Sequence, residues 1–401
     1  MSYRWLVPLA AVALIACEPE NPLATAPTPE TLTATMDASE RAGPGQLSVA
    51  TWNVYYGADL DVLLAPGALP LPVRVAQVFG QVQATDAPER AAAMAKLIAA
   101  SRPDLVGLQE VARYRVQSPG DFLDGAGNVQ NPFPNAATEV FDFVSLLLDA
   151  LDAEDVPYVE ASRTTTFDVE LPMYTGGPCP PCDDLRLTES VAVLARSDVE
   201  ITNPDGDVFA INLPISVEGF GIEIVKGWAS IDATVKGVTR RFVTTHLEPA
   251  DIGPDHAVIP EVEQIQLAQA AELVGILDGS DVPVILTGDL NSDPDGGTTD
   301  TYAFFAGEGF VDAWTKGRPR GDGYTANQAA DLLNTESQLF HRIDLVLYRD
   351  DFTANGRPFR GAVHAELLGE EQADRTASNL WPSDHAGVLA RLFPPPALAS
   401  R

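Results

Sequence analysis

Short, continuous apolar stretches rich in β-branched residues recur along the chain after residue 46. The clearest is Val282–Thr287 (VPVILT), and Ser190–Leu194 (SVAVL) has the same character. These stretches have the length of strands, but they lack the polar–apolar alternation of a sheet with one face in water. Strands of this kind belong in sheets that are covered on both faces. The pattern therefore favours an α/β fold in which two packed sheets have helices outside them.

Helix signals separate the predicted strands. Asp86–Glu89 (DAPE) offers a capping Asp, a Pro in the first turn and a Glu three residues after the cap, which predicts a helix to about Ser101. Apolar residues at helical spacing predict further helices over about Thr138–Ala153 and Pro260–Leu277. The predicted strands are Leu47–Val54, Leu105–Leu108, Ser190–Leu194, Ile222–Val225, Ala229–Thr234, Arg241–Thr245, Val282–Thr287, Arg342–Leu347 and Ala386–Leu392.

The first 17 residues have the features of a secretory signal. Arg4 precedes a short apolar stretch, Trp5–Ala16, that is too short to span a bilayer as a stable helix. The stretch leads into Cys17, and this ending resembles a bacterial lipoprotein signal, in which the cut falls before a cysteine that becomes acylated. The alternative is an ordinary secretory signal with a chance cysteine. We expect lipidation of Cys17 and an extracytoplasmic protein anchored to a bacterial membrane, in the periplasm or at the cell surface.

Residues 18–45 are rich in Pro, Thr, Ala and acidic residues and lack apolar periodicity. Such a segment has no core of its own, so we expect a disordered tether. The predicted organisation is thus a lipoprotein signal over 1–17, a Pro/Thr-rich tether over 18–45 and one folded domain over 46–395.

The charge balance limits the partners of the chain. The 401 residues include 57 Asp and Glu but only 25 Lys and Arg, for a formal net charge of −32. Such a surface repels polyanions at long range and disfavours nucleic-acid binding through a basic groove. Lys316–Arg320 (KGRPR) is a short basic cluster of the kind usually found in a solvated turn. A divalent cation can still reverse the potential locally.

Two further cysteines stand close together, Cys179 and Cys182 in the stretch GGPCPPC. Outside the cytoplasm a disulfide in a small ring is the expected fate of such a pair. A redox role would need a following helix to lower a thiol pKa, and a zinc site would need further ligands nearby. We therefore predict a structural disulfide.

Polar residues recur where the predicted strands end. These residues are Asn53, Glu110, His246, Asp289, Asn291, Asp344, Asp384 and His385. Each alone has an ordinary explanation: Asn53 can bond nearby backbone in a turn, and His246 can be a satisfied core histidine. Strand ends are rigid, however, and can direct side chains from different elements onto one spot. Their joint occurrence predicts a common site.

The order of these residues resembles that of the endonuclease/exonuclease/phosphatase superfamily, which includes pancreatic-type deoxyribonucleases, apurinic endonucleases, neutral sphingomyelinases and inositol-polyphosphate phosphatases. The resemblance covers Leu47 to Leu392. The matching segments are Thr51–Val54 (TWNV), Leu108–Val111 (LQEV), Thr245–Leu247 (THL), Thr287–Asn291 (TGDLN), Arg342–Asp344 (RID) and Ser383–His385 (SDH). The resemblance implies a four-layer α/β/β/α sandwich with two packed mixed β-sheets, and an enzyme that hydrolyses phosphoesters.

The resemblance also implies a metal centre. Hard oxygen ligands select Mg²⁺ or a similar ion such as Mn²⁺ or Ca²⁺. Glu110 is the expected principal ligand, with help from Asn53, and Asp384 is expected to reach the ion directly or through water.

The remaining residues have expected roles at the attacked phosphate. By resemblance, His385 is the imidazole beside it and Asp344 is the carboxylate partner that fixes the tautomer of the ring. Asp289 and Asn291 orient the nucleophile, and His246 donates a hydrogen bond or proton to the phosphoryl group or leaving oxygen.

The chain departs from the family pattern in two insertions, Asp59–Thr85 and Gln117–Pro134. They form either lids or a membrane-facing rim, or else loops without a task. Three substrate classes stay open: nucleic acid, a phospholipid as for sphingomyelinases, and small phosphorylated solutes. A surface binding protein without catalysis is the least favoured alternative, because the acid, amide and imidazole set is intact. No protein partner is inferred.

Overall fold

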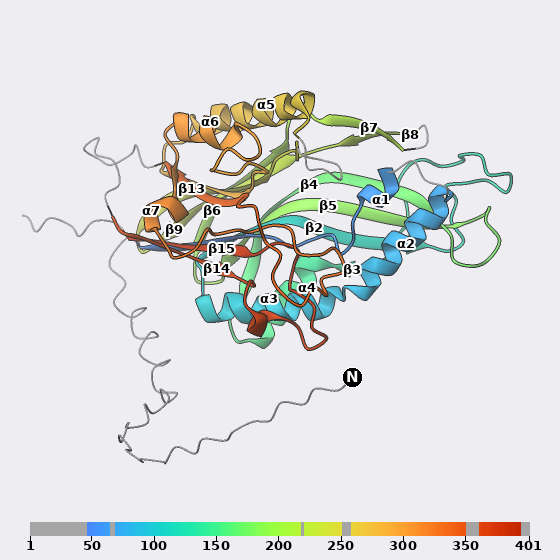
Figure 1. Ribbon diagram of the computed structural model, residues 1–401, viewed down its shortest axis with the longest axis horizontal. Helices are drawn as coiled ribbons and strands as arrows, with labels where there is room; N and C mark the ends of the chain where they lie inside the picture. Colours follow the sequence, from blue (N-terminus) through green and yellow to red (C-terminus); the bar gives the residue numbers. More distant parts are fainter. Residues whose placement is uncertain (1–45, 65–68, 218–219, 251–257, 350–360, 394–401) are drawn as a thin grey trace, which may run out of the picture. The chain divides into compact units, whose positions relative to one another are not determined.

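Figure 1 shows the computed structural model, which describes residues 46–64, 69–217, 220–250, 258–349 and 361–393. These residues all belong to one unit, Gly43–Arg401. The predicted signal with Cys17, the predicted tether and the last two residues of the predicted domain lie outside the described residues. Within the described part of the chain, no helix has both the length and the apolar character needed to cross a membrane.

The first sheet is mixed. Its strands lie in the order β14-β15-β1-β2-β5-β4, with β3 beside β2. β1 and β2 are parallel, and the other neighbours are antiparallel. The strands are β1 (Leu47–Asn53), β2 (Leu105–Gln117), β3 (Thr138–Asp142), β4 (Tyr158–Met173), β5 (Asp183–Arg196), β14 (Val363–Leu368) and β15 (Gly387–Leu392).

The second sheet is also mixed and has the order β12-β13-β11-β10-β9-β6. β10 and β11 are its parallel pair. The strands are β6 (Glu200–Val208), β9 (Gly227–Val235), β10 (Val238–His246), β11 (Val284–Asp289), β12 (Val311–Asp312) and β13 (Asp344–Arg349). A separate hairpin joins β7 (Leu213–Val217) to β8 (Phe220–Ile224).

Helices cover the outer faces of both sheets. In Figure 1, α5 and α6 lie above the second sheet, and α3 and α4 lie below the first. The predicted four-layer α/β/β/α sandwich is therefore confirmed. The helices are α1 (Asp61–Leu64), α2 (Leu71–Ala84), α3 (Ala87–Ser101), α4 (Phe143–Ala153), α5 (Pro260–Leu277), α6 (Thr301–Gly307) and α7 (Ala313–Gly317), with a short 3₁₀ helix η3 (Gln372–Asp374).

Three apolar layers hold the sandwich together. Side chains on the facing sides of the two sheets, among them Val49, Val193, Ile231, Phe242 and Ile285, form the central layer. The outer face of each sheet forms a further layer with its helices. Each central strand is thus buried on both faces, which explains why its sequence is a continuous apolar run.

Local signals set the helix starts. The Asp86 carboxylate accepts a hydrogen bond from the Glu89 backbone nitrogen at 3.0 Å, so the predicted cap of α3 is present. The prediction of a helix from Thr138 is wrong over its first five residues. Asp142 caps α4 by accepting from Val144 and Ser145, and the preceding residues, 138–142, pair with β2 as strand β3.

The two insertions pack at the same end of the first sheet. The 59–85 insertion contains α1 and α2, and α2 buries Val75, Val78 and Val82. These residues share one apolar cluster with Phe122 of the 117–134 insertion and with Tyr114 in the outer part of β2. Pro72 in the first turn is compatible with the start of α2. Both insertions therefore extend the core along β2, β4 and β5.

Gly107 of β2 is required where the sheets approach each other. A Cβ added there would meet the hydroxyl oxygens of Thr244 and Thr287 at 2.6 Å each. We expect Gly107→Ala to lower the free energy of unfolding by about 2 kcal/mol, because one of the buried hydroxyls must move. Urea unfolding of Gly80→Ala is the matched control, since nothing lies within 4 Å of a Cβ at Gly80. Equal stability of the two variants would contradict this account.

Candidate active site

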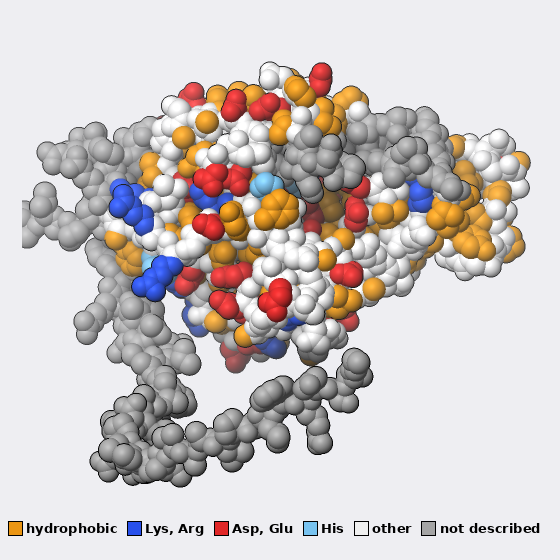
Figure 2. Space-filling view, viewed as in Figure 1, with side chains coloured by type: hydrophobic (Ala, Val, Ile, Leu, Met, Phe, Trp, Pro, Cys, Tyr) orange, Lys and Arg blue, Asp and Glu red, His pale blue; other side chains and the backbone are white. Residues whose placement is uncertain are grey.

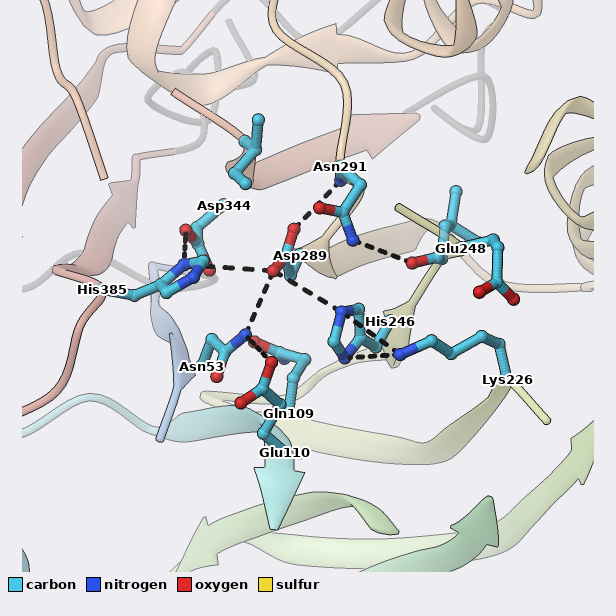
Figure 3. A network of polar contacts seen from close by, with 12 residues as sticks. Asn53, Gln109, Glu110, Lys226, His246, Glu248, Asp289, Asn291, Asp344 and His385 are labelled. Carbon is cyan, nitrogen blue, oxygen red and sulfur yellow. Dashed lines mark hydrogen bonds and ion pairs between the residues drawn. The ribbon is translucent and has the colours of Figure 1, made fainter. Parts of the chain in front are cut away.

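Strand register brings three of the predicted residues together. His246 ends β10 and Asp289 ends β11, and these two residues are partners in the parallel pair. Asp344 begins β13 and is the antiparallel partner of Asp289. The three side chains therefore start from adjacent positions on one edge of the second sheet (Figure 3).

Glu110 reaches the site from the first sheet by a different route. The expectation that its strand ends before Glu110 is wrong, because β2 continues to Gln117. The register between β2 and β5 shifts between Leu108 and Val111, and Glu110 within this irregularity has φ 55°. A bulge of this kind re-aims a side chain without ending the strand. The positive φ at a non-glycine residue is a strained conformation of the kind that clusters at functional sites.

Asn53 links the two sheets. Its Nδ2 donates to Glu110 Oε1 at 3.0 Å and to Asp289 Oδ2 at 3.1 Å, while its Oδ1 accepts from the Tyr55 backbone nitrogen. The other Glu110 oxygen accepts from the Tyr56 backbone nitrogen at 3.1 Å. One buried amide thus fixes the relative position of a carboxylate from each sheet.

His385 and Asp344 form the pair that the sequence predicts. His385 Nδ1 lies 2.7 Å from Asp344 Oδ2. The backbone carbonyl of His385 accepts from the Trp52 indole, and its backbone nitrogen donates to Ser383 Oγ. Burial alone would lower the pKa of His385, but the charges of Asp344 and Asp384 outweigh it and hold the pKa well above its ordinary value.

His246 lies between acidic groups. Its Nε2 is 3.6 Å from Asp289 Oδ2, and its Nδ1 is 3.7 Å from Glu189 Oε1. Lys226 Nζ lies 3.4 Å from the same Nδ1. Sequence reasoning missed Glu189 and Lys226. Glu189 directly precedes the apolar run Ser190–Leu194. A carboxylate at the start of a predicted buried strand could have identified it as a candidate.

Asn291 positions its neighbours. Its backbone nitrogen donates to Asp289 Oδ1 at 3.0 Å, and its side-chain Nδ2 donates to the Leu247 carbonyl at 2.9 Å. The backbone at Asn291 therefore holds Asp289 by Oδ1. The other oxygen, Oδ2, faces Asn53 and the two histidines, His246 and His385. In this structure the amide nitrogen of Asn291 holds the loop that follows β10.

A fully buried arginine that the sequence did not mark supports the Asp384 loop. The Arg90 guanidinium donates to the carbonyls of Val54 at 2.8 Å and Pro382 at 3.2 Å. Burial lowers the pKa of Arg90 to about 10, and the charge of Asp384 is the largest influence in the opposite direction. Arg90 thus ties the residues that follow β1 to the segment that carries Asp384 and His385.

The acidic groups of the site suit a hard cation. Burial, followed by the charge of Asp384, raises the pKa of Glu110 to about 7, and burial raises the pKa of Asp384. Raised pKa values of this kind show that the surrounding protein groups do not fully compensate the negative charge of these carboxylates. One potential ligand atom from each of Asp289, Asp344 and His385 also lies within 4.8 Å of the others. The oxygen-rich donor set therefore fits a divalent ion of the Mg²⁺ type.

The pKa of Glu110 predicts how cation binding depends on pH. Its folded-state pKa of about 7 exceeds the ordinary 4.5, so the proton on Glu110 stabilises the fold below about pH 4.5, and this contribution is lost as the pH rises through 7. A cation needs the ionised carboxylate and competes with that proton. We expect a fixed Mg²⁺ concentration to raise the melting temperature more at pH 8 than at pH 6. An equal rise at both values would show that Glu110 does not hold the ion.

A sequence model of the Endonuclease/Exonuclease/phosphatase family matches residues 50–385. The chain belongs to this family. Its members are phosphoester hydrolases, so the chain is placed among enzymes of EC class 3.1. The site residues at both ends of the chain, from Asn53 to His385, fall within the matched range. No curated protein matches the chain in sequence.

Several solved structures are similar to this family member. A family protein from Bacteroides thetaiotaomicron is 16% identical over 90% of this chain and 99% of its own, with a TM-score of 0.50. Humanized D. rerio TDP2 is 17% identical over 86% and 98%, with a TM-score of 0.49. A mannosyl-6-phosphatase from B. thetaiotaomicron VPI-5482 is 16% identical over 86% and 99%, with a TM-score of 0.48.

Proposed function

We propose that this chain is a divalent-metal-dependent phosphodiesterase of the nuclease-like kind, in which a water molecule attacks phosphorus. The observation that carries the proposal is the His385–Asp344 pair, at 2.7 Å, next to carboxylates from both sheets. In this proposal a base, a cation and a proton donor act at one place, and phosphoester hydrolysis uses these three functions.

His385 is the general base in this proposal. Asp344 occupies Nδ1, so Nε2 is the nitrogen that takes the proton from water, and the Asp344 charge stabilises the resulting imidazolium. Asp289, held at one oxygen by Asn291, orients the water. His246 donates to the phosphoryl group or to the leaving oxygen.

The cation in this proposal is Mg²⁺, with Mn²⁺ or Ca²⁺ as alternatives. Glu110 and Asp384 would hold it, with Asn53 beside them. A bound divalent ion supplies positive charge that stabilises the extra negative charge on the phosphoryl oxygens. The same charge would offset that of Asp384, which after Asp344 is the largest of the charges that raise the pKa of His385, so a bound cation would favour the neutral imidazole.

The charge of the site favours a diester over a monoester. Six carboxylates lie in or beside it, whereas the basic side chains described above are Lys226, whose Nζ is 3.4 Å from His246 Nδ1, and Arg90, whose charge acts on Asp384. On the face that Figure 2 draws, acidic side chains are spread widely and basic ones stand at a few places. A phosphomonoester carries about two negative charges near neutral pH and a diester one, so the acidic site repels a monoester more. The six carboxylates are Glu110, Glu189, Glu248, Asp289, Asp344 and Asp384.

A substrate panel tests the proposal. The full chain would be treated with EDTA, supplied again with Mg²⁺, and assayed on single- and double-stranded DNA, RNA, sphingomyelin vesicles and sugar phosphates. We expect hydrolysis of DNA or RNA only with added ion. Preference for sphingomyelin would replace the nuclease-like proposal with a phospholipid phosphodiesterase, and preference for sugar phosphates would replace it with a phosphatase. Binding without turnover of any substrate would contradict catalysis itself.

We also propose that Cys17 carries a lipid anchor and that the enzyme acts outside the cytoplasm, bound to a bacterial membrane. The support is the sequence that precedes Cys17. We expect labelled palmitate to enter the wild-type chain expressed in a bacterial host, and to be absent from Cys17→Ser. Equal labelling of the two chains would contradict the anchor.

A further inference from the structure

A second group of carboxylates lies far along the first sheet from the active site. Asp121 belongs to the 117–134 insertion, Glu170 to β4 and Asp184 to β5. One oxygen from each lies within 4.8 Å of the others. β2 alone runs six residues beyond Val111, to Gln117, a length of about 20 Å, so this group is separate from the active site.

Each carboxylate uses one oxygen to bind the insertion or the two residues that follow it. Asp184 Oδ2 accepts from the backbone nitrogens of Asp121 at 2.6 Å and Phe122 at 3.0 Å. Glu170 Oε2 accepts from those of Asn135 and Ala136, both at 2.7 Å. The hydrogen bonds to Asp121 Oδ2 come from the side chains of Asn131 and Asn135.

The other oxygen of each carboxylate is buried and has no hydrogen-bond partner among the described residues: Asp121 Oδ1, Glu170 Oε1 and Asp184 Oδ1. The Glu170 and Asp184 residues are only 3% and 1% exposed. Within the described part of the chain, no Lys or Arg forms an ion pair with any of the three. Burying carboxylate oxygens without a partner is costly, so this arrangement points to a missing positive ligand.

The backbone around Asp184 is shaped to its carboxylate. A Cβ at Gly120 would meet the carboxyl carbon of Asp184 at 2.3 Å and both its oxygens at 2.4 Å. The Gly120 backbone nitrogen donates to the Cys182 carbonyl, beside the disulfide between Cys179 and Cys182. The loop therefore comes directly over the carboxylate, which only a glycine allows.

We propose that Asp121, Glu170 and Asp184 form a second cation site, which binds Ca²⁺ and fixes the 117–134 insertion to the β4–β5 hairpin. Ca²⁺ takes six to eight oxygen ligands in flexible geometry, whereas Mg²⁺ keeps more of its water. Three carboxylates that come from one loop and two strands suit the larger ion. The role is structural and independent of the proposed hydrolysis.

Ca²⁺ binding to the full chain tests this site. Glu110→Gln with Asp384→Asn removes the charge of the active-site ligands, and equilibrium dialysis with Ca²⁺ alone counts the ions that remain. We expect one bound ion per chain in this background, and an affinity at least about ten-fold lower when Glu170→Gln is added. Retention of no Ca²⁺ in the background, or an unchanged affinity after Glu170→Gln, would overturn the proposal.

Asp183→Asn is the matched control. Asp183 adjoins Asp184 on β5, but its carboxylate accepts from Ser118 and Thr175 instead of facing the group. We expect its Ca²⁺ affinity to equal that of the background. An equal loss of Ca²⁺ affinity in Asp183→Asn and Glu170→Gln would show that the loss follows from the change in net charge, and would overturn the site. Ca²⁺ should also slow proteolysis of the background protein within residues 117–134. This measurement does not require the Glu170→Gln variant to fold. Unchanged cleavage would count against the proposal.

Discussion

Replacing His385 with alanine is expected to lower kcat for diester hydrolysis by about a thousand-fold, a loss within the usual range for a general base. The variant removes the only described imidazole that is hydrogen-bonded to a carboxylate within 3 Å, at Asp344. The measurement is kcat at saturating Mg²⁺ for wild type and variant. Since the role is proton transfer, KM is expected to change much less than kcat.

His364→Ala is the control for this variant, because His364 is an exposed histidine on β14. It is expected to keep wild-type activity. Full activity of His385→Ala would mean that another residue is the base, with Asp289 the next candidate because it lies between His246 and His385. Family membership would be unaffected by that result.

Replacing Glu110 with alanine is expected to lower kcat by at least about a hundred-fold, because electrostatic stabilisation of the transition state is lost with the cation. Glu110 is also the carboxylate that Asn53 and Tyr56 hold in place. The same variant should lose most of the thermal stabilisation that Mg²⁺ gives to the wild type, since the ion then has one ligand fewer.

Glu200→Ala is the matched control, since Glu200 is an exposed residue at the start of β6. It should keep both turnover and the response to Mg²⁺. If Glu110→Ala lost activity but kept the full stabilisation by Mg²⁺, the ion would have to bind elsewhere. The group formed by Asp289, Asp344 and His385 would then be the alternative location.

The sequence predicted nine of the strands, including the central β1, β10, β11 and β13, but it missed β3, β4, β6, β7, β12 and β14. Val284–Thr287 is buried on both faces of β11, so its apolar run is unambiguous, and Asp289 follows it at the edge. The parallel pairing of β10 with β11 then places His246 beside Asp289. The ends of neighbouring parallel strands meet in this way when the strands are in register. The proximity of His246 and Asp289 could therefore be expected before the structure was known.

Features that depend on tertiary contacts could not be predicted. Glu110 reaches the site through a bulge in β2, and a bulge leaves no mark in hydrophobic periodicity. Residues 138–142 have helical spacing with the residues that follow, but pairing with β2 makes them a strand. Arg90 looked like any polar residue of an amphipathic helix, yet it is fully buried because four carbonyls surround its guanidinium.

The second carboxylate group could not be predicted from the sequence either. Asp121, Glu170 and Asp184 stand in segments with no motif, and only the pairing of β4 with β5 and the path of the insertion bring them together. Lys226 is a similar case. A lysine is expected to be exposed, and only the structure shows the carboxylates that surround this buried one. Sequence reasoning finds groups at strand ends more easily than groups assembled by loops.

The account as a whole depends on one cation that joins Glu110 and Asp384 beside His385. The most direct measurement is the hydrolysis of bis(p-nitrophenyl) phosphate by the full chain before chelation, after chelation and after return of Mg²⁺. The account predicts turnover that vanishes with EDTA, returns with Mg²⁺ in the wild type and in Glu200→Ala, and fails to return in Glu110→Ala. Turnover by the wild type that persists after complete removal of divalent ions would contradict it.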